Sequence, residues 1–159
     1  MSRMFLSLCG IGFLPKRIGA GVAVLLTGVL LYALHLLLPV NPLYRFALLG
    51  GMALVTFALG AKAIPLAKDG SLYDHHWIVI DELLGVLLAF APMMIWRPGE
   101  FMFVTAAALT MLFGFFDHWK PLGIRSIDAM EDWPIAVLLD DCVAGVYAAL
   151  VYFVVERLL

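Results

Sequence analysis

Five long apolar runs separated by short polar segments dominate the pattern of side chains along the chain. Each run is apolar on nearly every side, and together they cover about residues 19–39, 45–63, 77–96, 101–117 and 136–157. A helix that is apolar all round lies in a protein core or in lipid, and about 20 apolar residues cross the hydrocarbon core of a bilayer. The pattern therefore predicts an all-α polytopic membrane protein, a helical bundle of about five transmembrane helices.

The N-terminal stretch before these runs is shorter and mixed in character. Arg3 is followed by a brief apolar segment, which is the outline of a secretory signal, but residues 15–17 read Pro-Lys-Arg where a signal peptide has small residues for cleavage. We expect this stretch to be retained as an interfacial or re-entrant segment. The polar segments are too short for a second domain, so residues 1–159 are predicted to form a single membrane domain.

The composition agrees with lipid as the solvent. The 159 residues are 64% hydrophobic and 14% charged, whereas soluble domains carry about 25% charged residues. The net charge is −2 and no block is rich in Lys and Arg, so the sequence gives no reason to expect a nucleic acid partner.

The positive charges predict an orientation in the membrane. With the N-terminus in the cytoplasm, that side holds seven Lys and Arg residues and the opposite side three, namely Arg45, Arg97 and Arg157. Cytoplasmic loops of membrane proteins carry the excess of Lys and Arg. We therefore expect the N-terminus to be cytoplasmic.

The acidic side chains, which did not enter that count, gather on the same side. Ten of the twelve carboxylates fall at the cytoplasmic face, and six of them mark the ends of three apolar runs: Asp74, Asp81, Glu82, Asp117, Asp140 and Asp141. Carboxylates from three helix ends repel each other unless they share a cation. Oxygen ligands with few His or Cys nearby suit a hard ion, Mg²⁺ before Mn²⁺ or Ca²⁺, so the pattern predicts a shared divalent metal ion.

Basic residues on that face suit an anionic ligand. Lys120 follows Asp117 by three positions and projects on the same side of a continuing helix, and Arg125 comes shortly after. Lys16 and Arg17 stand just before the glycine-rich start of the first apolar run, where backbone can approach a ligand closely. A metal ion that polarises a phosphoryl oxygen, together with these cations, predicts phosphate chemistry.

Simpler interpretations of the same residues stay open. Asp140 and Asp141 could form ion pairs with Lys120 and Arg125 that only fix the packing of helices. The two acids that open the third run could be favoured by the helix dipole alone. No metal-binding spacing supports the histidines at positions 75 and 76, which we interpret as interfacial loop residues.

Three segments carry a more specific signal. They read DHHWIVIDELLG at 74–85, FFDHWKPLGI at 115–124 and LLDDCVAG at 138–145. Together, and in this order, they resemble the phosphatidylglycerophosphatase A family, whose pattern is approximately Asp, IVxDExxG, RxxDxxKPxPI and DDxxAG. Members of this family are small integral membrane enzymes that remove the terminal phosphate from phosphatidylglycerophosphate.

The resemblance implies a Mg²⁺-dependent phosphatase that acts on a phospholipid at the cytoplasmic face of the bacterial inner membrane and yields phosphatidylglycerol. It also implies which residues form the catalytic and metal-binding set: Asp81, Glu82, Asp117, Asp140 and Asp141, with Asp74 near them and Lys120 for phosphate. Gly85, Pro121 and Gly145 would be packing or turn positions.

The chain departs from the family pattern at three places. Gly114 stands where the pattern has Arg, Trp133-Pro134 replaces a glycine-rich stretch, and KRIGAG at 16–21 replaces a segment of the PGTxGS type. These departures concern phosphate contacts, while the metal-binding candidates are intact. We hypothesise that substrate phosphate is held by other cations: Lys16, Arg17 and Arg125.

Two other functions remain open at this point. The chain could be a diverged non-catalytic homologue that keeps the acidic metal site but has lost phosphate handling. It could also be a cation transporter, since carboxylates inside a membrane mark ion paths. Acids at one end only argue against transport, because the outer halves of the helices then lack ionisable steps. The sequence leaves the oligomeric state undetermined.

Overall fold

The computed structural model describes residues 2–15, 18–37, 41–67, 73, 75–95, 102–130 and 132–158, and every regular element in these ranges is helical. This confirms the predicted all-α class. The long helices are α2 (Ile18–Leu37), α3 (Pro42–Ala63), α6 (Met102–Trp119) and α8 (Ala136–Leu158). The short elements are α1 (Ser2–Leu6), η1 (Ile11–Phe13), η2 (Ile64–Ala67), α4 (Ile80–Ala89), α5 (Ala91–Ile95) and α7 (Ile124–Asp128), where η marks a 3₁₀ helix.

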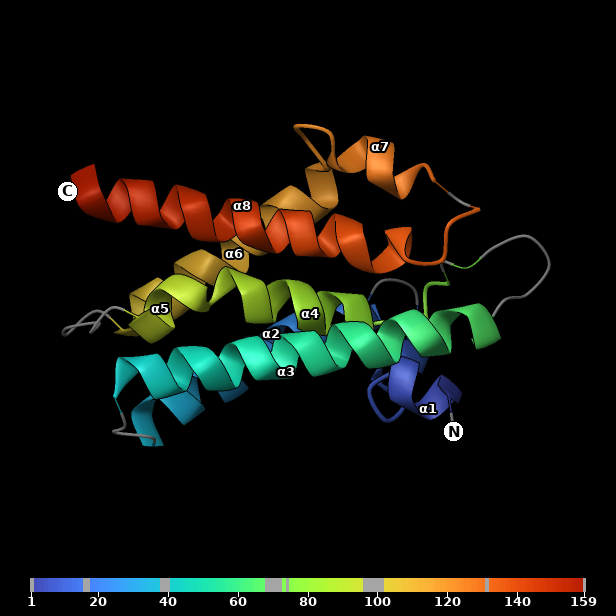
Figure 1. Cartoon of the computed structure of the whole chain (residues 1–159), viewed down its shortest axis with the longest axis horizontal. Coiled ribbons are helices and arrows are strands. Elements are labelled where there is room, and N and C mark those ends of the chain that lie inside the picture. The colour runs from blue at the N-terminus through green and yellow to red at the C-terminus, as the bar shows by residue number, and fades with distance from the viewer. Residues whose placement is uncertain are drawn as a thin grey trace.

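Helix α4 forms the centre of the bundle (Figure 1). It packs against α8, α3, α2 and α6, and Val86, Leu87 and Ala89 on it are completely buried. Its ten residues rise about 15 Å, half of the roughly 30 Å of a bilayer core. The side chains of α4 therefore meet protein on nearly all sides and not lipid.

The helices around α4 present apolar side chains outward. Three are long and apolar enough to cross a membrane: α2 with 20 residues, α3 continued by η2 with 26, and α8 with 23. Helix α6 is apolar but shorter. Leu25, Leu54 and Leu150 are 62%, 69% and 54% exposed on these surfaces. An apolar exterior of this extent suits contact with lipid tails.

The third apolar run is not the single helix that we expected over residues 77–96. Helix α4 starts at Ile80, ends at Ala89, and is followed at Phe90 by a turn into α5. Pro92 explains the break, because a proline cannot donate to the carbonyl four residues earlier and its ring collides with that carbonyl. Apolar character alone could not reveal this division.

Local signals set the ends of two other helices. The Asn41 Oδ1 atom accepts a hydrogen bond of 2.9 Å from the Leu43 amide, which satisfies a donor at the start of α3, and Pro42 fits the first helical position. Gly123, with φ of 91°, precedes α7 in a left-handed conformation that glycine adopts without strain. These caps decide where the chain turns between the packed helices.

The N-terminal segment folds back against the approach to α4. The Val79 amide donates to the Leu6 carbonyl at 2.9 Å, and the Trp77 ring stacks on Phe13 with centroids 5.8 Å apart. A Cβ atom on Gly12 would overlap the Trp77 carbonyl oxygen. The segment is therefore part of the packed structure on which the start of α4 rests.

Candidate functional site

Helices α4 and α8 touch backbone to backbone at two glycines. A Cβ atom on Gly145 would overlap the carbonyl oxygen of Gly85 and lie 3.1 Å from the Leu88 Cβ. A Cβ atom on Gly85 would overlap the Phe113 ring and lie 2.9 Å from the Asp141 carbonyl oxygen. Neither position has room for a side chain, so the contact requires glycine on both helices.

This contact explains how two distant acidic residues meet. Asp81 precedes Gly85 by four residues and Asp141 precedes Gly145 by four, so each lies about one helical turn, or about 6 Å, before the contact. The two helices start at the same end of the bundle (Figure 1), and both turns therefore project toward the same place.

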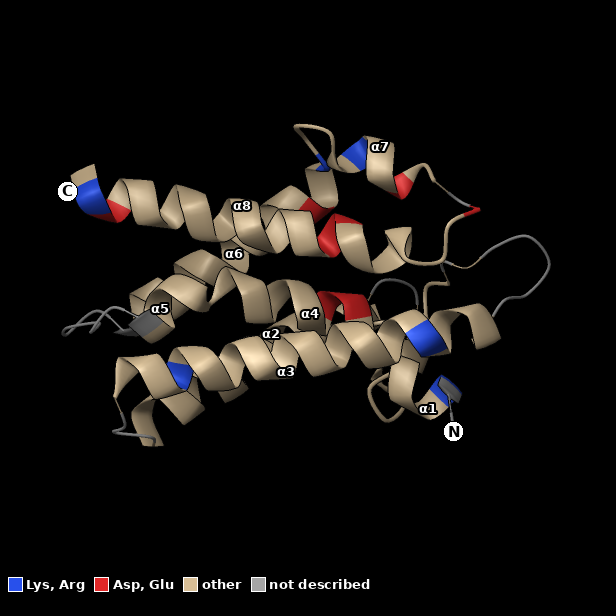
Figure 2. Ribbon diagram, viewed as in Figure 1, with Lys and Arg blue, Asp and Glu red and all other residues tan. Residues whose placement is uncertain are grey.

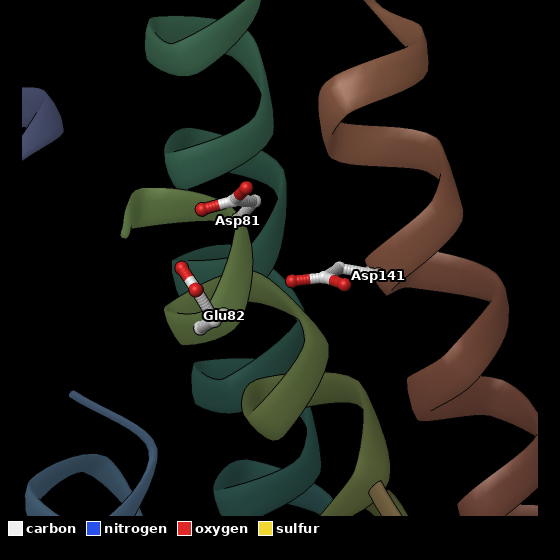
Figure 3. Close-up of side chains that lie close together, drawn as sticks. All are labelled: Asp81, Glu82 and Asp141. Atoms are coloured by element: carbon white, nitrogen blue, oxygen red, sulfur yellow. The ribbon is translucent and has the colours of Figure 1, made fainter. Parts of the chain in front are cut away.

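Three carboxylates converge there. Asp81, Glu82 and Asp141 each offer an oxygen within 4.8 Å of the other two, and Figure 3 shows the pair on α4 facing the single acid on α8. Asp81 is 9% exposed and Asp141 is 4% exposed. Two full charges 4.8 Å apart repel by roughly 3 to 4 kcal/mol at an effective dielectric constant of about 20, which favours a cation between them.

The geometry fits a small divalent ion. Oxygens on opposite sides of a Mg²⁺ ion are about 4 Å apart, because each bond is about 2.0–2.1 Å long. Adjacent oxygens around the ion are closer, about 3 Å apart. The three carboxylates offer oxygens within 4.8 Å of one another, so rotation of their side chains would bring them together around one ion. The oxygen-only donor set is the kind that Mg²⁺ prefers.

A cavity of about 780 Å³ opens beside the three carboxylates. Ligand pockets in proteins are typically about 300–1,000 Å³. The cavity wall also contains the other expected site residues that the structure describes: Asp117, Lys120, Arg125 and Asp140. Asp117 is close enough to Asp141 for their charges to repel, but it lies outside the group of three. Lys16, Arg17 and Asp74, which we also expected here, lie outside the described residues.

Lys120 connects two elements across the cavity rim. It directly follows α6 with φ of 45°, and its Nζ atom donates to Asp128 Oδ1 and to Asp140 Oδ2, each at 2.5 Å. Burial by itself would lower the pKa of Lys120, but hydrogen bonds to Asp128 and Asp140 outweigh it and the pKa is raised. The lysine that we expected on phosphate thus holds α7 to α8 in this structure.

The adjacent acids of α8 have different surroundings. Asp140 has the ion pair that the simpler interpretation offered, although its other oxygen, Oδ1, is buried without a hydrogen-bond partner among the described residues. Asp141 points to α4 and is in no ion pair within the described part of the chain. The ion-pair interpretation therefore accounts for one acid of the two.

Arg125 and Gly114 shape the remaining wall. Arg125 projects from α7 into the cavity lining, where no ion pair to a described residue engages it. A Cβ atom on Gly114 would meet nothing within 4 Å, so the position where the family pattern has Arg is open space. This leaves room beside the acids for an anionic group.

Histidines also line the cavity: His75 and His76, which we interpreted as interfacial loop residues, and His118, which the sequence analysis did not single out. None of their ring nitrogens joins the 4.8 Å group of carboxylates among the described residues. Spacing along the sequence gave no signal for them, because the loop before α4 and the end of α6 meet only in the folded bundle.

Comparisons with known proteins point to one enzyme family. The family model described as Phosphatidylglycerophosphatase A matches residues 4–156. The chain is 34% identical over 90 residues to the Phosphatidylglycerophosphatase A of Haemophilus influenzae, which covers 55% of this chain and 51% of the relative. It is 35% identical over 91 residues to that of Escherichia coli, covering 55% and 49%. The chain thus aligns with about half the length of these two relatives.

A third relative aligns over more of its length. It is a protein of Bacteroides thetaiotaomicron named "Putative phosphatidylinositol-3-phosphatase", 33% identical over 140 residues, or 87% of this chain and 83% of the relative. No solved structure matches the chain significantly.

Proposed function

The chain belongs to the phosphatidylglycerophosphatase A family, and we propose that it hydrolyses the phosphate monoester of phosphatidylglycerophosphate to phosphatidylglycerol and inorganic phosphate. It is an integral membrane protein with three helices long and apolar enough to cross a bilayer. Apolar helix faces beside the cavity let the acyl chains of a lipid stay in the membrane while its head group enters. The observation that carries this proposal is the convergence of Asp81, Glu82 and Asp141 beside an open cavity.

A metal ion is the second part of the proposal. Six carboxylates but only two Lys and Arg side chains line the cavity among the described residues, so a phosphate ester enters favourably only when a cation offsets the excess negative charge. Asp81, Glu82 and Asp141 would hold Mg²⁺. When bound there, the ion would act as a Lewis acid on a phosphoryl oxygen.

Side chains of the cavity would contact the phosphate and orient the attacking water. Arg125 is placed to contact the phosphate, because it lines the cavity without a carboxylate partner among the described residues. Asp117 lines the cavity outside the group of three and would orient the attacking water. Water adds to phosphorus, the bond from phosphorus to the lipid oxygen breaks, and the lipid alcohol leaves with a proton.

The proposal also includes an orientation. Charged residues gather at the end of the bundle where α4 and α8 begin, as Figure 2 shows. The excess of Lys and Arg on that side supports a cytoplasmic location for it, and family membership supports the bacterial inner membrane. The site would then face the inner leaflet, where the head group of a lipid substrate is within reach.

The experiment is phosphate release by the purified full chain in mixed micelles. Phosphatidylglycerophosphate is the substrate, and phosphatidic acid and phosphatidylinositol 3-phosphate are competitors, the latter because of the name of the Bacteroides relative. We expect release that requires Mg²⁺ and stops reversibly with a chelator. Phosphate release that persists in chelator would contradict the proposed metal requirement. Binding of Mg²⁺ without phosphate release from any of the three lipids would favour the non-catalytic alternative.

A further inference from the structure

His75 presents a buried nitrogen at the cavity. The residue lies in the loop before α4 and lines the cavity together with the three carboxylates. Its Nε2 atom is buried and has no hydrogen-bond partner among the described residues. Buried polar atoms are almost always hydrogen-bonded in native structures, so this nitrogen requires a partner that the described chain does not supply.

The imidazole ring is held in place by an aromatic stack. His75 stacks on Trp77 with centroids 5.6 Å apart and an interplanar angle of 9°. Trp77 in turn stacks on Phe13 at 5.8 Å, and the Arg3 guanidinium lies 5.8 Å from the Trp77 ring centroid. The N-terminal segment thereby fixes the direction in which the His75 ring faces.

Two possible partners for Nε2 are excluded within the described chain. A carboxylate is the common partner of a histidine, and six line the cavity, yet none accepts from this atom. A metal ion held by Asp81, Glu82 and Asp141 is the other, but His75 does not belong to the group of atoms that lie within 4.8 Å of one another. Because no partner is found within the described chain, an acceptor that enters with the substrate fits this atom.

We infer that His75 Nε2 donates a hydrogen bond to a non-bridging oxygen of the phosphate monoester in the bound lipid. The inference rests on the proposed phosphatase function and adds a phosphate-binding residue to it. A phosphoryl group brings acceptor oxygens into a cavity whose Lys120 already donates to Asp128 and Asp140. The imidazole would thus make up for cationic contacts that the departures from the family pattern removed.

The test measures inhibition by orthovanadate, a phosphate analogue, in the Mg²⁺-dependent assay with the full chain. His75→Ala should raise the inhibition constant of vanadate about tenfold to a hundredfold, the worth of a hydrogen bond to a charged group, and should leave the half-saturating Mg²⁺ concentration unchanged. His75→Gln, which keeps a donor, should restore part of the affinity. His76→Ala is the comparison, because His76 lines the same cavity but is exposed; a hydrogen bond specific to His75 predicts a smaller rise in the constant for His76→Ala than for His75→Ala.

A second variant tests the stack. Trp77→Leu leaves His75 in place but frees its ring, so it should raise the vanadate constant in the same direction by a smaller factor. In ¹⁵N-labelled wild type, the Nε2 resonance of His75 should shift when vanadate is added. Thermal unfolding of each variant in micelles separates a loss of binding from a loss of fold.

Several results would overturn the inference. An unchanged vanadate constant in folded His75→Ala rejects it while the phosphatase function stands. If His76→Ala raises the vanadate constant as much as His75→Ala does, the effect is a general electrostatic one and the inference is wrong. If His75→Ala also raises the half-saturating Mg²⁺ concentration, His75 acts on the cation and not on the phosphate. Wild-type chain that neither releases phosphate nor binds vanadate rejects the inference together with the proposed function.

Discussion

The two ends of the bundle both bury ionisable groups, but in different ways. At the start of α3, Arg45 donates from Nη1 to the His35 ring at 2.8 Å, beside an apolar cavity of about 20 Å³, room for about one water. At the opposite end, where α4 and α8 begin, six carboxylates of the described chain line a cavity of about 780 Å³. Helices α3 and α4 run in opposite directions (Figure 1), which places the two sites at opposite ends.

The difference teaches when a buried charge indicates a ligand. His35 and Arg45 come from consecutive helices and pair through the Arg45 Nη1 atom, although the Arg45 Nε atom is buried without a hydrogen-bond partner among the described residues. Asp81, Glu82 and Asp141 carry the same sign when ionised and repel one another at this spacing. Like charges brought together beside an open cavity indicate an exogenous cation, whereas a donor and an acceptor in a small apolar space indicate packing.

Removing one carboxylate of the acidic end should have the largest effect. Asp81→Asn, Asp117→Asn and Asp141→Asn should each lower kcat/KM for phosphate release about 10²–10³-fold, because Asp81 and Asp141 would hold the metal ion and Asp117 would orient the attacking water. Asp132→Asn, at an exposed position, should retain wild-type kcat/KM. Wild-type activity in any of the first three variants removes that residue from the site.

Separating α4 from α8 should have the next largest effect. Gly145→Ala puts a Cβ atom into the Gly85 carbonyl and should lower the free energy of unfolding by about 1–3 kcal/mol, as overpacking does. Gly114→Ala makes the same chemical change in open space and should be neutral or stabilising by about 0.5–1 kcal/mol. Denaturant unfolding in micelles measures both. Equal free energies for the two variants would contradict the close contact.

The two ion pairs of Lys120, one to Asp128 and one to Asp140, should contribute unequally to the free energy of unfolding. Lys120→Met leaves the buried Asp140 without its partner and should cost about 1–3 kcal/mol of unfolding free energy. Asp128→Asn removes the other ion pair, in which the Asp128 side chain is 38% exposed, and should cost about 0–1 kcal/mol. A larger loss of unfolding free energy in Asp128→Asn than in Lys120→Met would contradict this expectation. It would show that Lys120 mainly stabilises α7 and not the buried Asp140.

At the opposite end of the bundle we expect an effect on stability and none on activity. His35→Ala removes the partner of Arg45 and should lower the free energy of unfolding by about 0.5–1.5 kcal/mol, with kcat/KM for phosphate release unchanged. Measuring both quantities on one preparation sharpens the comparison between the ends. A tenfold loss of activity without unfolding would show that the two ends are coupled.

Much of the fold could be predicted from the apolar runs. Helices α2, α3 and α8 appear within a few residues of the expected ranges, because an apolar stretch of the right length is itself the signal for a helix in lipid. The division at Phe90 could not be predicted from that pattern, since apolar character does not separate a short buried helix from one that spans lipid. The packing of the N-terminal segment on Trp77 depends on contacts between distant residues.

The candidate site shows the same limit. The acidic composition of three helix ends predicted a cluster, and Asp81, Glu82 and Asp141 do converge. Successive residues of a helix point about 100° apart, so Asp140 turns to Lys120 while Asp141 turns to α4. Which acid meets which neighbour depends on the placement of α7, and His75 depends on the N-terminal segment. Neither placement is encoded in local spacing.

The glycine contact between α4 and α8 also has a consequence for how the protein is assembled. Two of the three carboxylates come with α4 and the third comes with α8. A cation that binds all three acids can do so only after these helices have docked, and its binding free energy then adds to the stability of the completed bundle. Ion binding would thus report that α4 and α8 have docked.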